Sequence, residues 1–283
     1  MYRACVILLV VLTGCSGVGF DSDSPTDRSV EPVTPVPVPA ADPATLRTSG
    51  IDDDGVSDPA ALATAHGQWL ANRSYTLTSN QTVRYENGTV RSQYTVHLRL
   101  TEDRTYHAAV RTGGVDGPKV LGEPPAYAEF WSDRETYVRA FGEPDPRYNE
   151  FSPTASGVGT WYFWAMTGSF TFRMTPGVMI QSSFSEVPTR IETRRIEAGV
   201  PRYRLTSPEP TTASLPFPDA VPARNVSLTA EVDGTGLVRQ LRLDYRGRID
   251  EEPVVVTRRI SYTNVGSTDA DRPEWFDEAA DST

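Results

Sequence analysis

The sequence predicts a mainly β fold with few helices, built on one antiparallel sheet. Apolar and polar residues alternate along many short segments, which is typical of strands buried on one face only. Turn sequences rich in Gly, Asn and Asp separate these segments. Strands do not alternate with helices, as they would in a parallel sheet. We expect roughly eight to ten strands in a single β-rich domain over residues 56–277.

The first predicted element is a helix that begins near Pro59. Ser57 or Asp58 can cap its N-terminus, and proline suits the first helical turn. Apolar residues then recur at helical spacing. These are Leu62, Ala65, Trp69 and Leu70.

Strands are predicted from Arg73 onward, where the period changes to two. The clearest alternating runs are 94–100, 106–111, 226–232, 237–245 and 254–262. Asn87-Gly88 is the strongest hairpin signal, and Ser132–Glu135 is a second turn. Asp233-Gly234-Thr235-Gly236 is better explained as a turn than as a phosphate-binding loop.

The segment from Trp161 to Met179 is dense in aromatic residues and lacks clean alternation. One interpretation is that it forms a wall of a hydrophobic cavity. The other is ordinary core, or a helix laid across the open sheet, because aromatic residues bury large areas without any ligand. The candidate cavity residues are Trp161, Phe163, Trp164, Phe170, Phe172 and Met174.

The N-terminus resembles a lipoprotein signal. Arg3 precedes the apolar run Ala4–Leu12, which is shorter than the roughly 20 residues that span a bilayer. Leu12-Thr13-Gly14-Cys15 then matches a lipobox. We expect residues 1–14 to be a signal peptide and Cys15 to carry a palmitate-like or archaeol lipid, which places the chain on the outer face of the cell membrane. The alternative is an ordinary secretory signal with a chance cysteine.

Residues 15–55 are predicted to form a disordered spacer behind the lipid-bearing cysteine. Five prolines between Pro32 and Pro43 favour an extended backbone, and large apolar residues are few. Residues 278–283 are expected to be an acidic tail.

Composition limits the possible functions. The formal charge is −10, and Lys119 is the single lysine among 27 basic residues. An acidic, arginine-rich chain indicates a protein that works in high salt, although a GC-rich genome also favours arginine over lysine. The charge argues against nucleic-acid binding. Cys5 lies in the predicted signal, so the mature chain has no disulfide.

No catalytic or metal-binding motif is found. His66, His97 and His107 are the only histidines. His97 and His107 flank a predicted turn and could form a metal pair, but zinc needs three or four protein ligands, so two solvent-facing histidines are the preferred interpretation. We expect no cofactor and no enzymatic activity.

Four of the six asparagines lie in N-glycosylation sequons: Asn72, Asn80, Asn87 and Asn225. Glycans on an outward face are one interpretation. For Asn87 the alternative is its role in the turn, since asparagine readily takes a positive φ.

Together, the lipobox, the spacer, Asn87–Arg91, Trp131–Arg139 and Arg272–Phe276 resemble a family of uncharacterised haloarchaeal surface lipoproteins. The fold is similar to LolA-like and LppX-like lipid carriers. That resemblance implies a sheet curled into a half-open barrel, with a helix against its concave face. It also implies a lipid, isoprenoid or other apolar ligand. The alternative is a glycosylated structural or interaction protein of the cell envelope; an extracytoplasmic hydrolase is the least favoured. The sequence does not predict the oligomeric state.

Overall fold

The computed structural model of the chain describes residues 48–168, 173–215 and 220–281. The predicted signal peptide 1–14, Cys15 and most of the spacer lie outside the described residues, as do Phe170 and Phe172. No helix in the described ranges is long and apolar enough to cross a membrane.

The described part is mainly β, with four helices. The elements in chain order are α1 (Pro59–Ala71), β1 (Tyr75–Tyr85), β2 (Val90–Leu100), β3 (Tyr106–Gly113), β4 (Ala126–Ser132), β5 (Tyr137–Phe141), β6 (Arg147–Glu150), α2 (Trp161–Ala165), β7 (Thr167–Gly168), β8 (Arg173–Met174), α3 (Pro176–Glu186), β9 (Arg190–Glu197), β10 (Val200–Thr206), β11 (Val221–Asp233), β12 (Val238–Ile249), β13 (Glu252–Thr263) and α4 (Phe276–Asp281).

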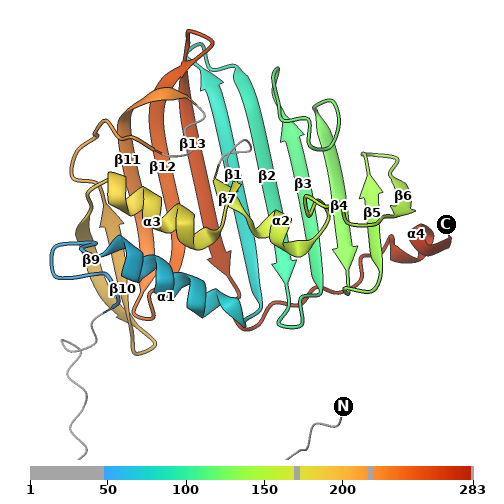
Figure 1. Cartoon of the computed structure of the whole chain (residues 1–283), viewed down its shortest axis with the longest axis horizontal. Helices are drawn as coiled ribbons and strands as arrows, with labels where there is room; N and C mark the ends of the chain where they lie inside the picture. The colour runs from blue at the N-terminus through green and yellow to red at the C-terminus, as the bar shows by residue number, and fades with distance from the viewer. Residues whose placement is uncertain (1–47, 169–172, 216–219, 282–283) are drawn as a thin grey trace, which may run out of the picture. The chain divides into compact units, whose positions relative to one another are not determined.

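One antiparallel sheet of 11 strands organises the domain, in the order β6-β5-β4-β3-β2-β1-β13-β12-β11-β10-β9. Strands β1–β6 and β9–β13 are two meanders, and pairing of β1 with β13 joins them. The edge strands β6 and β9 do not meet, so the sheet is open (Figure 1). The predicted mainly β, antiparallel fold with an open sheet is confirmed.

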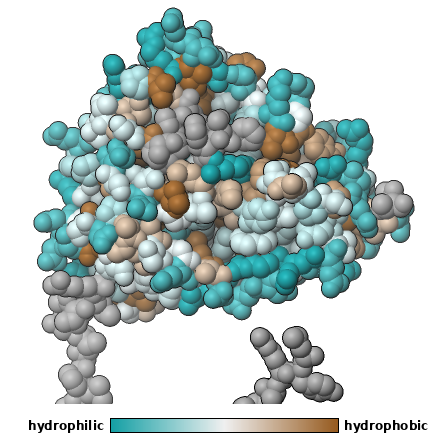
Figure 2. Space-filling model, viewed as in Figure 1, coloured by the Kyte–Doolittle hydropathy of each residue, from teal (hydrophilic) through white to brown (hydrophobic). Residues whose placement is uncertain are grey.

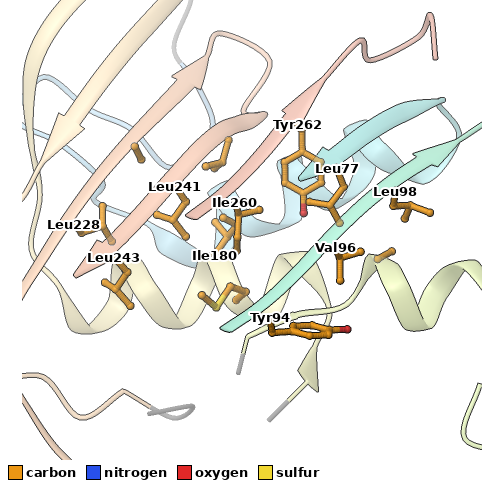
Figure 3. Close-up of a cluster of buried hydrophobic side chains, with 14 of the residues drawn as sticks. Leu77, Tyr94, Val96, Leu98, Ile180, Leu228, Leu241, Leu243, Ile260 and Tyr262 are labelled. Atoms are coloured by element: carbon orange, nitrogen blue, oxygen red, sulfur yellow. The ribbon is translucent and has the colours of Figure 1, made fainter. Parts of the chain in front are cut away.

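Helices α1, α2 and α3 lie across one face of this sheet (Figure 1), and the main core lies between the two layers. Alternate strand residues point into this core, including the fully buried Leu77, Leu98 and Leu243 (Figure 3). From α3, Ile180 packs against them. Burying each such side chain stabilises the fold by about 1.5–3 kcal/mol.

Helix α4 packs against the opposite face of the sheet. Neighbouring residues of β4 point to opposite faces: Phe130 contacts Trp164 of α2, and Trp131 contacts Phe276 of α4 with ring centroids 5.0 Å apart. Ala279 of α4 is fully buried. The segment expected to be an acidic tail therefore begins within this packed helix.

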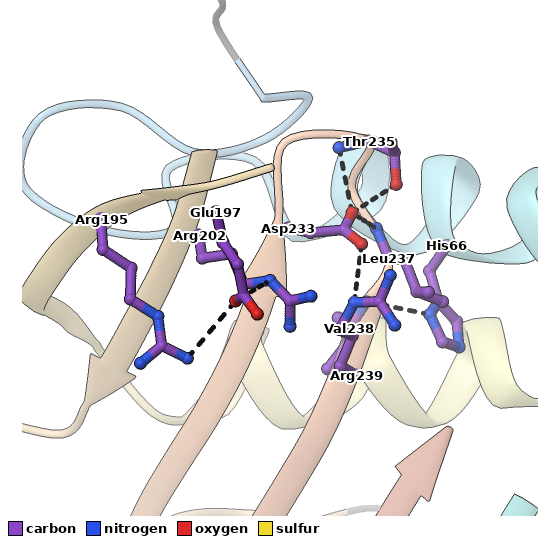
Figure 4. Close-up of polar contacts among 9 residues, drawn as sticks. All are labelled: His66, Arg195, Glu197, Arg202, Asp233, Thr235, Leu237, Val238 and Arg239. Carbon is purple, nitrogen blue, oxygen red and sulfur yellow. Dashed lines mark hydrogen bonds and ion pairs between the residues drawn. The ribbon is translucent and has the colours of Figure 1, made fainter. Parts of the chain in front are cut away.

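The sequence signals for the first helix and for the turns are confirmed. The Asp58 carboxylate accepts a hydrogen bond from the Ala61 backbone N–H at 2.9 Å, which caps α1. Gly88 has a φ of +88° in the β1–β2 hairpin. The Asp233 carboxylate accepts hydrogen bonds from the backbone N–H groups of Thr235 and Leu237 in the β11–β12 turn (Figure 4).

Residues before the predicted domain boundary at residue 56 also pack against the domain. Ile51 is buried and forms an isolated β-bridge with Val56. Gly50 lies so close to α1 that a Cβ there would be 2.2 Å from the Asp58 carbonyl oxygen. These contacts place the last residues of the predicted spacer against the domain.

Candidate functional site

An apolar pocket of about 310 Å³ lies where the three helices of the covered face meet. The C-terminal half of α1, helix α2 and the first residues of α3 form its walls, together with Tyr75 and Arg104. Most of the helix-bearing surface is hydrophilic, with apolar residues in small groups (Figure 2). The lining residues are Gly67, Leu70, Ala71, Tyr75, Arg104, Trp161, Tyr162, Ala165, Met166, Thr175, Pro176 and Gly177.

Small residues shape this pocket. Gly177 of α3 lies beside α1, where a Cβ would be 3.5 Å from the Ala63 carbonyl oxygen, an ordinary contact distance. A Cβ at Gly67 would have no heavy atom within 4 Å. Gly67 is therefore a helical position whose missing side chain leaves open space within the lining.

The aromatic segment places its residues in two environments. Trp161 lines the pocket and is half-buried. Phe163 and the fully buried Trp164 belong to the core, where the Trp164 ring lies 4.6 Å from that of Phe130. Met174 packs against the same core. Helix α2 lies across β2 and β3, and of the four described candidates Trp161 reaches the pocket.

Arg104 supplies positive charge at the pocket. It lies in the β2–β3 turn with a φ of +73°, and its guanidinium donates a hydrogen bond to the carbonyl oxygen of Ala71 at the end of α1. The same guanidinium lies 5.1 Å from the centroid of the Trp161 ring. Arg104 thus joins the helix end to the aromatic wall and keeps a cation beside apolar surface.

Tyr75 adds a neutral hydroxyl to the lining. Burial raises the pKa of Tyr75 to about 12, although the nearby Arg104 lowers it in part. The hydroxyl therefore stays protonated at neutral pH. The lining is thus apolar apart from the phenols of Tyr75 and Tyr162, the Trp161 indole N–H, one guanidinium and the Thr175 hydroxyl.

A polar groove of about 500 Å³ adjoins the apolar pocket. The two share Arg104, Trp161 and Tyr162. The remaining lining comes largely from the β4–β5 turn, including Ser132, Asp133, Arg134 and Glu135. An elongated molecule with an apolar body and a polar end could therefore lie across both spaces.

Gly67, Gly177, Tyr75 and Arg104 were not singled out by the sequence. A glycine inside a helical pattern, such as Gly67, is a signal that could have been used, because it costs about 1 kcal/mol relative to alanine and calls for a reason. Arg104 carries no such signal.

The three histidines contact different partners and do not form a common site. His66 is buried under α1, and its Nδ1 accepts a hydrogen bond from the Val238 backbone N–H at 3.2 Å (Figure 4). Nδ1 of His97 lies 3.2 Å from the Thr78 hydroxyl, and His107 Nε2 lies 2.8 Å from the Glu129 carboxylate. Within the described ranges, no three His, Cys, Asp or Glu side chains group as a metal site would require.

Glu129 is a junction between the sheet and the C-terminal segment. Its carboxylate accepts hydrogen bonds from the Tyr127 hydroxyl at 2.6 Å and the Trp275 indole N–H at 2.9 Å, in addition to its His107 contact. The His107 hydrogen bond is the main reason why the pKa of Glu129 falls to about 2. These three bonds engage both carboxylate oxygens and hold Trp275 against β4.

The sequon asparagines differ in exposure. Asn72 at the end of α1, Asn87 in its hairpin and Asn225 in β11 are exposed. Asn80 is half-buried in the middle of β1, where its amide donates to the Thr95 hydroxyl at 3.0 Å and accepts from Thr82. Three of the four side chains are thus accessible in the folded chain.

Comparison with known proteins gives one match along nearly the whole chain. A family of unknown function, DUF7537, matches residues 2–279. No curated protein matches the sequence significantly. The haloarchaeal origin stays a prediction.

Several solved structures are similar over most of the domain. LprF from Mycobacterium bovis has a TM-score of 0.36 and 12% identity, over 76% of this chain and 96% of its own. A LolA superfamily protein from Nitrosomonas europaea has a TM-score of 0.24 and 8% identity, over 77% of this chain and 96% of its own. A DUF1329 family protein from Desulfovibrio piger has a TM-score of 0.25 and 12% identity, over 78% of this chain and 97% of its own. LolA-like proteins therefore do occur among the similar structures, but TM-scores this low identify no ligand.

Proposed function

The chain belongs to this family of unknown function, and we propose that it binds a single-chain amphiphile in the pocket between α1, α2 and α3. The observation that carries the proposal is the apolar pocket of about 310 Å³ that shares Arg104 with a polar groove. The apolar chain lies against Leu70, Ala165 and Trp161. The polar end lies in the groove beside the β4–β5 turn.

The size of the pocket favours one lipid or isoprenoid chain. Ligand pockets in proteins are typically about 300–1,000 Å³, so this one is at the small end of the range. Each buried methylene contributes about 0.8 kcal/mol, so roughly eight methylenes contribute about 6 kcal/mol before the cost of association. Because that cost is of similar size, contacts of the polar end have to supply the rest of the affinity.

An anionic or phosphate-bearing head group fits the polar end best. Arg104 uses part of its planar fork on the Ala71 carbonyl oxygen, and a guanidinium has five N–H donors. Arg134 lies in the same groove and is exposed. A phosphate or carboxylate between these two side chains would gain charge-assisted hydrogen bonds. Asp133 and Glu135 in the groove would disfavour a second negative charge.

The proposal includes attachment to the outer face of the cell membrane through a lipid on Cys15. The lipobox Leu12–Cys15 and the proline-rich spacer support it. A tethered domain would stay close to a membrane that supplies its amphiphile. If Cys15 carries the anchor, a Cys15→Ser variant is released to the medium or keeps its uncleaved signal. Retention in the membrane after cleavage of the signal would contradict the anchor.

A glycosylated envelope protein without a small ligand is the second candidate. It is favoured by the exposure of Asn72, Asn87 and Asn225, which leaves three sequons accessible in the folded domain. Mass spectrometry of the native protein tests it directly, and bare asparagine at all three sites would rule it out.

Gly67→Leu tests the amphiphile pocket. The new side chain enters open space, and leucine favours the helix over glycine by roughly 1 kcal/mol, so the variant should be at least as stable as the native chain. We expect the full chain to bind the fluorescent fatty acid cis-parinaric acid, and Gly67→Leu to weaken this binding at least tenfold. Gly67→Ala should weaken it less.

Gly113→Leu is the matched control, because a Cβ there also has no atom within 4 Å and the residue does not line the pocket. It should bind the probe like the native chain. Equal binding by Gly67→Leu and the native chain would contradict the proposal, and so would an equal loss in both leucine variants.

A further inference from the structure

The face of the sheet opposite the helices carries a second and chemically different hollow, of about 760 Å³. It extends over β1, β13, β12, β11 and β10. Helix α4 packs against β5 and β6 and leaves these five strands uncovered. Neighbouring strands lie about 4.8 Å apart, so the hollow is roughly 20 Å across. We call it the open-face hollow.

The lining of the open-face hollow is positively charged, opposite in sign to the chain as a whole. The whole chain has a formal charge of −10, yet four arginines and one glutamate line this space. The lining residues are Thr78, Asn80, Thr82, Arg84, Arg204, Thr229, Ala230, Glu231, Gln240, Leu241, Arg242, Val255, Thr257, Arg259, Ile260 and Ser261. Local charge of this kind raises the concentration of anions near the surface.

Two of the arginines face each other directly. Arg259 of β13 pairs with Arg242 of β12 in the sheet register, and like charges in this position destabilise a sheet. Asp244 neutralises Arg242 through a hydrogen bond of 2.9 Å. The Arg259 side chain is exposed, and its guanidinium makes no hydrogen bond or ion pair with any residue that the structure describes. An anion bound to the Arg259 guanidinium would neutralise the second charge of the pair.

The remaining arginines differ in how far their charge is already neutralised by carboxylates of the chain. Arg204 forms ion pairs with Glu192 at 2.6 Å and Glu231 at 3.7 Å. Arg84 donates to the Gly88 carbonyl oxygen at 3.2 Å and forms no ion pair in the described part of the chain. Arg84 and Arg259 are therefore the two cations whose charge is available to a ligand.

Hydroxyl and amide groups surround these cations. Asn80 lies opposite Arg259 across β1 and β13, and Thr82 lies opposite Thr257. No aromatic side chain lines the hollow. The lining can therefore bind carboxylates and hydroxyl groups, but it offers no aromatic stacking surface.

We propose that the open-face hollow binds an anionic polysaccharide, with carboxylates held by Arg259 and Arg84 and sugar hydroxyls held by the threonine and asparagine side chains. The planar guanidinium matches a carboxylate bidentately. A polymer chain can follow a hollow about 20 Å across, whereas a bilayer is flat and would be met first by residues that protrude. This ligand is separate from the amphiphile, since the two sites lie on opposite faces of the sheet.

Binding of polygalacturonate to the purified full chain tests the proposal, with neutral dextran and phosphatidylglycerol vesicles as the other arms. We expect polygalacturonate to bind, and Arg259→Gln and Arg84→Gln each to weaken it at least fivefold. The affinity should fall as salt increases, because counterions compete for the guanidinium groups. Arg147→Gln, which removes one exposed arginine at the far edge strand β6, should change the affinity less than twofold.

A thermal-shift measurement separates folding from binding. Without ligand, Arg259→Gln should melt no lower than the native chain, because it removes a like-charge contact. Polygalacturonate should raise the melting temperature of the native chain more than that of Arg259→Gln at the same concentration. Equal binding of dextran, an equal loss in Arg147→Gln, or vesicle binding that depends on Arg259 without polygalacturonate binding would each overturn the proposal.

Discussion

The two faces of the sheet use the same strands for different purposes. On β13, Val256 and Ile260 are buried under the helices, while Thr257 and Arg259 alternate with them on the open face. The covered face is mainly apolar and closely packed, apart from the small pocket beside Gly67, and it also buries His66 and Arg258. The open face is polar, hydroxyl-rich and positively charged in its hollow.

This contrast separates the residues that stabilise the fold from those that are free to bind. Removing apolar contacts on the covered face costs several kcal/mol, whereas surface substitutions are usually within about 0.5 kcal/mol. The covered face can accommodate a ligand where a helix lacks a side chain. The open face can change its side chains with little effect on folding.

The largest difference is expected between two consecutive residues of β2. Leu98 is fully buried on the covered face, and Arg99 lies on the open face, where it is 3.9 Å from Asp271. Leu98→Ala should lower the free energy of unfolding by about 3–4 kcal/mol, and Arg99→Ala by less than about 1 kcal/mol. Urea denaturation measures both, and similar values would remove the distinction between the faces.

Acid should weaken the covered face through His66. Burial lowers the pKa of His66 to about 4, so the folded chain binds fewer protons than the unfolded chain below pH 6.5. Stability is complete above pH 6.5 and is lost as the pH falls toward 4, by about 3 kcal/mol over that window. Unfolding of the native chain and of His66→Gln between pH 7 and 4.5 tests this.

His97→Gln is the control for the acid experiment. Burial also lowers the pKa of His97, helped by His107 and Arg99, but this histidine is exposed on the open face. The variant His97→Gln should change the pH dependence of stability much less than His66→Gln does. An acid loss that persists in His66→Gln would contradict the assignment.

The β11–β12 turn should be sensitive to substitution of Gly236, because this turn contacts α1. Gly236 has a φ of +85°, and a Cβ there would be 2.6 Å from the Cβ of Ala65. Gly236→Ala should cost roughly 2 kcal/mol, while Gly88→Ala, with a similar φ and no neighbour, should cost about 1 kcal/mol. Thermal unfolding measures the difference. A double variant with Ala65→Gly should recover part of the larger cost, and equal costs at the two turns would contradict a packed β11–β12 turn.

Of the contacts compared, the attachment of the C-terminal segment to the opposite face should contribute least to the free energy of unfolding. Trp275→Phe keeps the ring but removes the 2.9 Å hydrogen bond to Glu129, so we expect a loss of about 1 kcal/mol. The pKa of Glu129 lies near 2, so its contribution is present above pH 4.5 and is lost as the pH falls toward 2. Hydrogen exchange in α4 should rise in Trp275→Phe, and unchanged exchange would show that the bond does not hold the segment.

The sequence predicts elements whose physics is local. The Asp58 cap, the Asn87-Gly88 hairpin and the Asp233 turn all satisfy their own backbone within a few residues, so short motifs reveal them. Alternation reveals strands with one buried face. Strand β9 was not recognised because all but one of its residues, Arg190–Glu197, are exposed, as suits a charged edge strand.

The two candidate sites depend on contacts between distant segments. The amphiphile pocket joins Gly67, Arg104 and Trp161 from three separate parts of the chain. The open-face hollow needs the register of five strands before Arg242 and Arg259 can be placed opposite each other. Periodicity predicts which face a residue takes, but it does not predict which strand lies beside it.

Nuclear magnetic resonance of the isotopically labelled full chain tests the account most directly, by titration with dodecyl phosphate and then, separately, with polygalacturonate. The account predicts that dodecyl phosphate shifts the amide signals of Gly67 and Ala165, and that polygalacturonate shifts those of Thr257 and Arg259. If both ligands shifted the same set of signals, or if dodecyl phosphate left the signals of α1 and α2 unchanged, the assignment of the two faces to two ligands would be contradicted.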